Sequence, residues 1–182
     1  PRSDSSAASD VYKRQDPAFE KEIDPKQRAW IEVKGKALET NVRQLRSKLG
    51  KNCQFMAVVK ADGYGHDARV VSEYAIKGGA SQLGVATLKE GIRLRSAGLK
   101  KPILILGNLY TKEDLTISFK NDLMPTISSL RECLICNNIG KHFGSKFSLH
   151  LKVDTGMSRL GFEASKFVQQ FKKIKSFENI LI

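Results

Sequence analysis

Short apolar runs alternate with longer amphipathic segments along most of this chain. The apolar runs are AWIEV, QFMAVVK, QLGVAT, PILILG, LMPTIS, FSLHLKVD and NILI, which begin near residues 29, 54, 82, 102, 123, 147 and 179. Between them, segments such as ALETNVRQLRSKL and TLKEGIRLRSAG repeat apolar residues every three or four positions. The first kind of pattern predicts strands and the second predicts helices. The sequence therefore predicts a repeated strand–helix architecture.

The spacing of the runs, about 25 residues, indicates parallel strands joined by right-handed crossovers. A doubly wound sheet and a (β/α)8 TIM-type barrel both satisfy that arrangement. The barrel is favoured because no GxGxxG dinucleotide fingerprint follows any predicted strand. It is also favoured by FSLHLKVD, where apolar residues alternate with His150, Lys152 and Asp154. A polar strand face fits the lumen or upper rim of a barrel better than a helix-covered surface.

The number of predicted strands is smaller than a closed barrel requires. Seven runs fit within 182 residues, and the last, from Asn179 to Ile182, has only begun where the sequence ends. We therefore expect an α/β fold of the TIM type, truncated after about six βα units. Residues 28–182 would form this incomplete barrel domain. Residues 1–15 are small, polar and without periodicity, so we expect a disordered or foreign tail over residues 1–27.

Composition narrows the classes of function. No run approaches the roughly 20 apolar residues of a membrane span, and no secretory signal is recognisable, so we expect a cytoplasmic protein without membrane contact. Three cysteines are too few for a disulfide framework, and the lone CxxC of Cys133 and Cys136 predicts two buried helix residues rather than a metal site. The net charge of +12 is spread along the whole chain, which favours a solvated surface over a nucleic-acid partner.

The stretch AVVKADGYGHDA, residues 57–68, ends an apolar run with a charged residue. In a βα barrel the carboxyl ends of the strands form the active site, and Lys60 ends the second predicted strand. Its amine could be a partly desolvated nucleophile suited to a Schiff base, or a rim lysine that extends into solvent. Gly63 and Gly65 permit a tight turn, and the hydroxyl of Tyr64 could bind a phosphate.

A second polar stretch, HLKVDTGMSRLGF at residues 150–162, follows the sixth predicted strand. Its DTG is typical of aspartic proteases, but those enzymes need two such turns facing each other. With one DTG on a parallel strand, the protease interpretation is excluded. A cationic pair, Lys152 and Arg159, then remains beside a glycine-rich turn on the same predicted rim as Lys60.

Together, AVVKADGYGHDA and HLKVDTGMSRLGF closely resemble the N-terminal barrel of the alanine racemase family. RAWIEV, LGVATLKEGIRLR and PILILG extend the resemblance from about Arg28 to the end of the chain. The resemblance implies a homodimeric isomerase that interconverts L-alanine and D-alanine with pyridoxal 5'-phosphate. Such enzymes supply D-alanine for peptidoglycan synthesis. No metal ion is expected.

The resemblance also implies roles for four residues. Lys60 would form the internal aldimine with pyridoxal phosphate and act as one of two bases. Tyr64 would bind the cofactor phosphate, and Arg159 would lie beside the cofactor's phenolic oxygen and the substrate carboxylate. Lys152 matches a lysine that is often carbamylated, which would hold Arg159 in place. The family's second base is a tyrosine in a C-terminal β domain of the partner subunit. Because this chain lacks that domain, we expect the fragment to be inactive alone.

Three alternatives remain. A non-catalytic pyridoxal-phosphate carrier of the same barrel fold would share the strand-end lysine, but the DTGMSRLGF pattern favours the racemase. A decarboxylase of the same fold is disfavoured by KADGYGH after the lysine. A basic nucleic-acid-binding module is the third alternative. The sequence leaves the substrate range beyond alanine open, with serine as one possibility.

Overall fold

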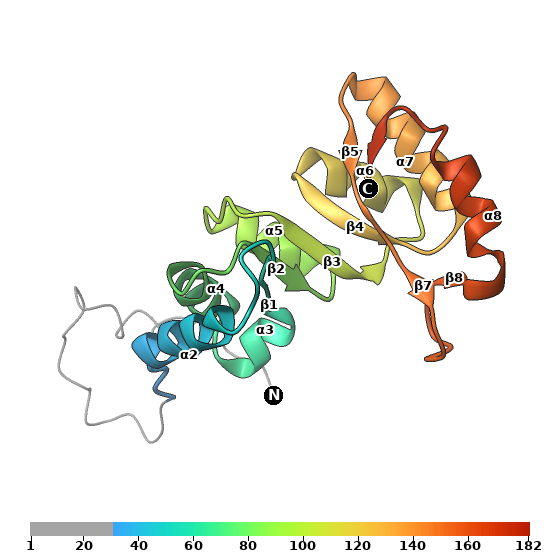
Figure 1. Cartoon of the computed structure of the whole chain (residues 1–182). Helices are drawn as coiled ribbons and strands as arrows, with labels where there is room; N and C mark the ends of the chain where they lie inside the picture. Colours follow the sequence, from blue (N-terminus) through green and yellow to red (C-terminus); the bar gives the residue numbers. More distant parts are fainter. Residues whose placement is uncertain (1–30) are drawn as a thin grey trace.

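Parallel strands form the centre of this α/β protein, which is described for residues 31–182 in a computed structural model (Figure 1). The main sheet has five strands, and each neighbouring pair is parallel. The strands occur in the spatial order β1 (Met56–Val58), β2 (Gln82–Val85), β3 (Ile103–Asn108), β4 (Leu123–Ile127) and β6 (His150–Leu151). The predicted alternation of strands and helices is therefore confirmed.

Helices connect these strands, and three of them begin at a hydroxyl residue that caps the first turn. Thr87, Thr111 and Ser129 each accept a hydrogen bond from the backbone N–H three residues further along. The helices are α2 (Gly35–Ser47), α3 (Lys60–Gly65), α4 (Ala68–Lys77), α5 (Leu88–Ser96), α6 (Lys112–Lys120), α7 (Leu130–Phe143) and α8 (Ala164–Ile174).

The run FSLHLKVD forms three short strands instead of one, because successive parts of it pair with different neighbours. β5 (Phe147–Ser148) pairs with β9 (Ile180–Leu181), β6 pairs with β4, and β7 (Val153–Asp154) pairs with β8 (Phe162–Glu163). The alternation of faces holds at the start of the run, where Phe147 and Leu149 are buried and His150 is exposed.

The predicted first strand is wrong for the part of AWIEV that is described. Residues 31–33 are not part of a strand; Ile31 and Glu32 are exposed, and Val33 is buried just before α2. Lys60 consequently follows the first strand of the described sheet, not the second.

The main sheet is open. β1 lies at one edge and β6 at the other, and the strands described between residues 31 and 182 do not close into a barrel. The predicted tail, residues 1–27, lies outside the described residues. Within residues 31–182, no helix has the length and apolar character needed to cross a membrane.

The core lies between the sheet and the helices, and it contains the CxxC. Cys133 and Cys136 are fully buried in α7 and belong to the same hydrophobic cluster as Leu83, Ile105 and Ile127. Burial raises the pKa of Cys133 to about 12 and raises that of Cys136 further. The prediction that these cysteines are buried helix residues is confirmed.

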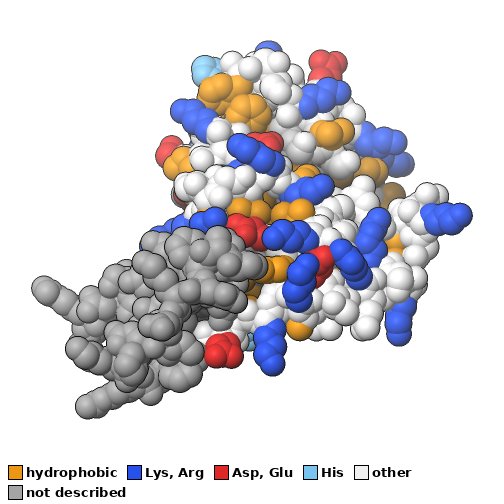
Figure 2. All heavy atoms as spheres, turned by 90° about the vertical axis from the view of Figure 1, so that its left-hand side faces the viewer, with side chains coloured by type: hydrophobic (Ala, Val, Ile, Leu, Met, Phe, Trp, Pro, Cys, Tyr) orange, Lys and Arg blue, Asp and Glu red, His pale blue; other side chains and the backbone are white. Residues whose placement is uncertain are grey.

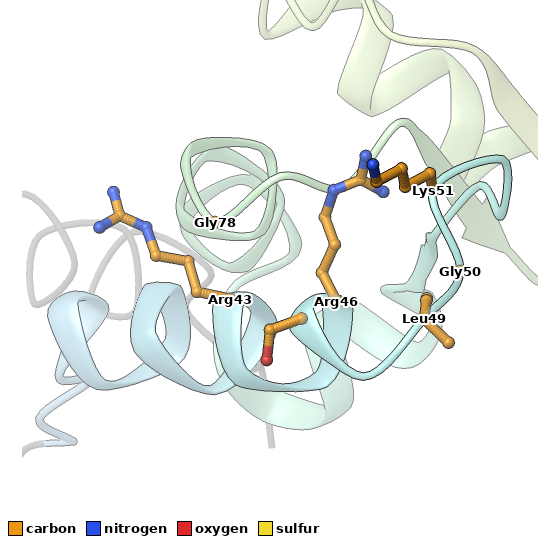
Figure 3. A pocket seen from close by; sticks show the side chains of 7 residues that line it. Arg43, Arg46, Leu49, Gly50, Lys51 and Gly78 are labelled. Carbon is orange, nitrogen blue, oxygen red and sulfur yellow. The ribbon is translucent and has the colours of Figure 1, made fainter.

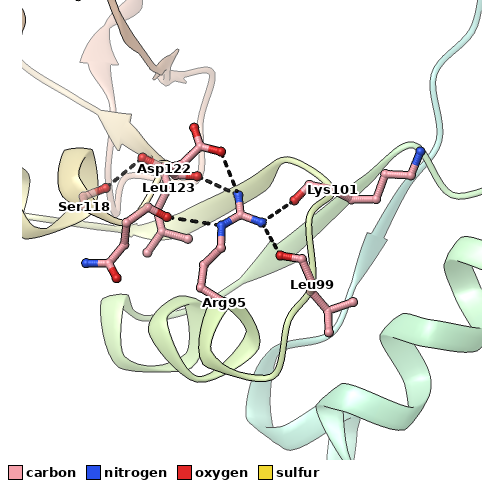
Figure 4. Close-up of polar contacts among 7 residues, drawn as sticks. Arg95, Leu99, Lys101, Ser118, Asp122 and Leu123 are labelled. Atoms are coloured by element: carbon pink, nitrogen blue, oxygen red, sulfur yellow. Dashed lines mark hydrogen bonds and ion pairs between the residues drawn. The ribbon is translucent and has the colours of Figure 1, made fainter.

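At the amino-terminal edge of the sheet, Arg95 joins two neighbouring βα units (Figure 4). Its guanidinium donates to the carbonyls of Leu99 (2.7 Å) and Lys101 (2.8 Å) before β3. It also donates to the carbonyls of Asn121 (3.2 Å) and Asp122 (2.6 Å) before β4. The side chain is only 13% exposed, and burial lowers the pKa of Arg95. These bonds hold together the segments that lead into β3 and β4, at the opposite end of the strands from Lys60.

Candidate active site

Lys60 and Lys152 both lie at the carboxyl ends of the parallel strands. Lys60 comes two residues after β1, and Lys152 comes directly after β6. Because all strands of the sheet are parallel, their carboxyl ends meet at one edge, which in parallel α/β folds is where ligands bind. The topology thus places the two polar stretches identified in the sequence on the same side of the fold.

The turn that carries Lys60 has an unusual backbone. Ala61, Asp62, Gly63 and Tyr64 all have left-handed conformations, with φ between 51° and 64°. For each of the three residues that carry a Cβ, this conformation costs about 1–2 kcal/mol, so the turn stores roughly 3–6 kcal/mol of strain. Strain of this size persists only where neighbouring contacts impose it, and it is concentrated at functional sites.

Several contacts impose this conformation on the turn. The N–H of Ala61 donates to the Glu90 carboxylate at 2.8 Å, and the N–H of Gly63 donates to the Val59 carbonyl at 3.0 Å. The Asp62 carboxylate accepts from the N–H of Ala68, the first residue of α4, at 3.2 Å. Gly63 is buried between these contacts.

A side chain at position 63 is disfavoured for two reasons. Its φ of +64° is strained for any residue with a Cβ, and an added Cβ would lie 3.0 Å from the Cγ2 of Val71 and 3.2 Å from the backbone of Ala68. The sequence predicted a tight turn at this glycine, and that prediction is confirmed. The sequence analysis did not predict that the backbone of this turn is left-handed.

Lys60 and Tyr64 are brought together by the turn. The Nζ of Lys60 lies 6.0 Å from the centroid of the Tyr64 ring, at the outer limit of a cation–π contact. Lys60 is half-buried, whereas Tyr64 is 59% exposed. An amine and a phenol therefore stand side by side at the rim, with the phenol open to an approaching ligand.

The second loop, residues 154–162, is organised by Asp154. Its Oδ1 accepts hydrogen bonds from the N–H groups of Gly156 (2.9 Å) and Ser158 (3.0 Å). These two donors hold the pKa of Asp154 below its ordinary value, and the charge of Lys152 acts in the same direction. Asp154 thus shapes the turn that presents Arg159, which is exposed. The aspartate of the DTG therefore has a structural role that the sequence did not predict.

The Lys60 turn follows β1 and the second loop comes after β6, so the two loops belong to the outermost strands of the described sheet. Lys60 and Lys152 follow strands that are four positions apart, and at a strand spacing of about 4.8 Å this corresponds to roughly 19 Å across a flat sheet. Within residues 31–182, no hydrogen bond or ion pair joins Lys152 to Arg159. The structure thus brings Lys60 and Tyr64 together. Lys152 and Arg159 are close in sequence, but the described residues show no hydrogen bond between them.

Glu90 is the residue near this site that the sequence analysis missed. It lies in the first turn of α5, and its carboxylate reaches the residue next to Lys60. The signal in the sequence is Thr87-x-x-Glu90, a capping box, which marks the start of a helix but not the additional contact.

Other surface features lie away from this rim. A hollow of about 360 Å³ is lined by Arg43, Arg46, Lys51 and neighbouring residues at the end of α2 (Figure 3). Another, of about 520 Å³, lies between α4 and the loop before β3. Figure 2 shows Lys and Arg side chains spread over the visible face, with acidic groups between several of them. The described residues contain no cluster of three or more His, Cys, Asp or Glu side chains suited to a metal ion.

Comparison with known proteins identifies the family. Residues 33–182 match the family described as "Alanine racemase, N-terminal domain". An alanine racemase of Prochlorococcus marinus is 52% identical over 157 residues, which cover 85% of this chain and 41% of that relative. An alanine racemase of Nostoc sp. is 46% identical over 153 residues, covering 81% of this chain and 40% of the relative.

A solved structure agrees with these matches. The alanine racemase of Clostridium difficile is 35% identical and superposes with a TM-score of 0.74, covering 80% of this chain and 40% of that one. The chain thus spans about two fifths of the length of the relatives that it matches. Because the matched residues make up most of the chain and include both loops of the rim, the chain belongs to the alanine racemase family.

Proposed function

We propose that the protein to which this chain belongs is an alanine racemase, a pyridoxal-phosphate-dependent enzyme that interconverts L-alanine and D-alanine. The observation that carries the proposal is Lys60, an amine held on a strained turn at the carboxyl edge of a parallel sheet. The activity named for relatives up to 52% identical supports it. The enzyme would work in the cytoplasm as a homodimer and supply D-alanine for peptidoglycan synthesis.

We further propose that residues 28–182 are the first part of a (β/α)8 barrel, with residues 1–27 outside it. The open five-stranded sheet would supply the first strands of that barrel. Closing the barrel would bring its edge strands around a common axis. The roughly 19 Å between Lys60 and Lys152 on a flat sheet would then become a shorter distance across the barrel mouth. The C-terminal β domain of the family would lie outside these 182 residues.

The donor groups of the rim fit pyridoxal phosphate by their chemistry. Lys60 offers a primary amine that can bind an aldehyde covalently, and it is half removed from solvent. The hydroxyl of Tyr64 would donate to the phosphate. When bound, the cofactor supplies an electron sink that stabilises negative charge at the substrate Cα. Lys60, once its amine is free, would remove or return the Cα proton on one face.

The second loop would bind the substrate. Arg159 would donate hydrogen bonds to the substrate carboxylate and to the cofactor's phenolic oxygen. Carbamylation of Lys152 would replace a cation by an anion at that position. The repulsion between Lys152 and Arg159 would then become an attraction, which would orient the guanidinium.

Racemisation also needs a base on the opposite face of Cα. In the family this base is a tyrosine from the C-terminal domain of the partner subunit. We therefore propose that the 182-residue chain does not racemise alanine alone. With pyridoxal phosphate and L-alanine added to residues 1–182, we expect no D-alanine. Turnover at the rate of an ordinary racemase would refute this proposal.

The proposed activity is tested on the full-length protein. We expect it to convert L-alanine to D-alanine, and we expect Lys60→Ala to abolish the conversion. Borohydride reduction in the presence of pyridoxal phosphate should attach the cofactor to Lys60, as peptide mass mapping would show. Lys89→Ala changes an exposed lysine of α5 and serves as the control. A full-length protein that is labelled at Lys60 but leaves L-alanine unchanged would support the pyridoxal-phosphate carrier instead.

A further inference from the structure

The carboxylate of Glu90 connects the Lys60 turn to the next βα unit. Its Oε2 accepts hydrogen bonds from the N–H groups of Ala86 (2.7 Å) and Thr87 (3.1 Å), within its own unit. Its Oε1 accepts from the N–H of Ala61 at 2.8 Å. Ala61 is 29 residues earlier in the chain and is the first residue after Lys60, so one side chain spans two adjacent units.

The bond to Ala61 is not explained by helix capping. The same sequence pattern begins α7, where Ser129 caps the helix and Glu132 lies three residues later. The carboxylate of Glu132 accepts from the N–H of Ser128 at 2.8 Å, which lies in its own unit. No hydrogen bond from Glu132 to another βα unit is present in residues 31–182. Glu90 therefore makes an additional contact that its counterpart in the same motif does not make.

The bond also lies at the point where the strained turn begins. Ala61 is the first of the four consecutive left-handed residues, and its φ is 51°. The Cα of Lys60 is joined to this N–H through a single planar peptide unit, so fixing Ala61 fixes the direction in which Lys60 leaves the strand. Without the Glu90 bond, the N–H of Ala61 would lose the acceptor that holds the turn at its start.

We propose that Glu90 is a positioning residue for Lys60, acting by holding the N–H of Ala61 so that the left-handed turn is maintained. The part of this inference that concerns cofactor chemistry rests on the function proposed above. The part that concerns the backbone of the turn stands independently of it. Glu90 touches neither substrate nor cofactor in this role.

Glu90→Gln is a discriminating substitution because three N–H donors share the two carboxylate oxygens. A glutamine side chain has one acceptor oxygen, and its NH₂ group would face an N–H donor in either orientation. Two of the three donors belong to the α5 side, so we expect the single oxygen to stay with Ala86 and Thr87 and the bond to Ala61 to be lost. Glu132→Gln is the matched control because it changes the glutamate at the same position of the Ser-x-x-Glu pattern that begins α7.

The first readout is amide hydrogen exchange, measured by NMR on the 1–182 chain. We expect Glu90→Gln to speed exchange at Ala61 and Gly63 by about tenfold, the effect of losing one charge-assisted hydrogen bond. Glu132→Gln should leave these two amides within about twofold of the unsubstituted chain after correction for global stability. If Glu90→Gln does not fold, Glu90→Asp keeps the charge but is one methylene too short to span both units, and it should show the same selective loss.

The second readout is covalent trapping of pyridoxal phosphate at Lys60 by borohydride. The initial rate of trapping should fall about fivefold or more in Glu90→Gln and stay unchanged in Glu132→Gln. Unchanged exchange at Ala61 in Glu90→Gln, or an equal change in Glu132→Gln, would overturn the inference. If the full-length protein is not labelled at Lys60, the proposed cofactor chemistry fails, and the exchange data alone still decide whether Glu90 holds the turn.

Discussion

Replacing Arg95 by methionine should destabilise the fold strongly without changing the rim that carries Lys60. Methionine keeps most of the apolar stem but removes every donor of the guanidinium. Two of the lost hydrogen bonds, to Leu99 and Asn121, are partly buried. At about 1.5 kcal/mol for each bond to a charged group, they account for roughly 3 kcal/mol of the free energy of unfolding.

The remaining bonds of Arg95 add little to this figure. Those to Lys101 and Asp122 are solvent-exposed, and the Asp122 side chain is 97% exposed, so water replaces the lost partner there. Urea unfolding followed by circular dichroism is the assay. At an m-value of about 2 kcal/mol/M, the midpoint should fall by roughly 1.5 M.

Arg93→Met is the control for this measurement. Arg93 lies on the same helix two residues earlier, and its side chain is exposed. We expect its substitution to change the free energy of unfolding by less than about 0.5 kcal/mol. A loss below about 1 kcal/mol for Arg95→Met, or equal losses for the two variants, would refute the assignment of Arg95 as the link between the two units.

Three further predictions concern the second loop and the cysteines. Gly161→Ala should cost about 2 kcal/mol or more, because at φ +136° the new Cβ would lie 2.5 Å from the nitrogen of Asp154, and chemical denaturation would measure this. Cys53, which is exposed, should react with a thiol reagent in the native state, whereas the buried Cys133 and Cys136 should react only after unfolding. Because burial raises the pKa of Cys133 from 9.0 to about 12, its contribution to stability should be complete below pH 9.0 and be lost as the pH rises towards 12.

Local patterns predicted the parts of the fold that depend on neighbouring residues. The alternation of apolar runs and amphipathic segments located five strands and their connecting helices, because burial on one face imposes a period on the sequence. The place of Cys133 and Cys136 on one face of a helix followed from their spacing, and the structure shows that this face is buried. The run AWIEV was misassigned in its described part because a β-rich composition is only a weak indication of a strand.

Contacts between units were decided by the tertiary structure. From the sequence, Arg95 cannot be distinguished from the many exposed cations. Its role in joining two βα units depends on carbonyls that lie 26 and 27 residues away. Glu90 reads as a helix-capping residue, and its bond to Ala61 spans 29 residues. A repeat of apolar and polar residues along the sequence carries no information about contacts between residues this far apart.

For this protein the sequence by itself determined the order of the βα units, the position of Lys60 at a strand end and the resemblance to a family. These properties depend on residue type and on spacing along the chain. Only the tertiary structure decided that the turn after Lys60 is left-handed and that Glu90 holds it. The physical reason is that a strained backbone is stable only where contacts from other parts of the chain oppose the strain, and folding brings those contacts together.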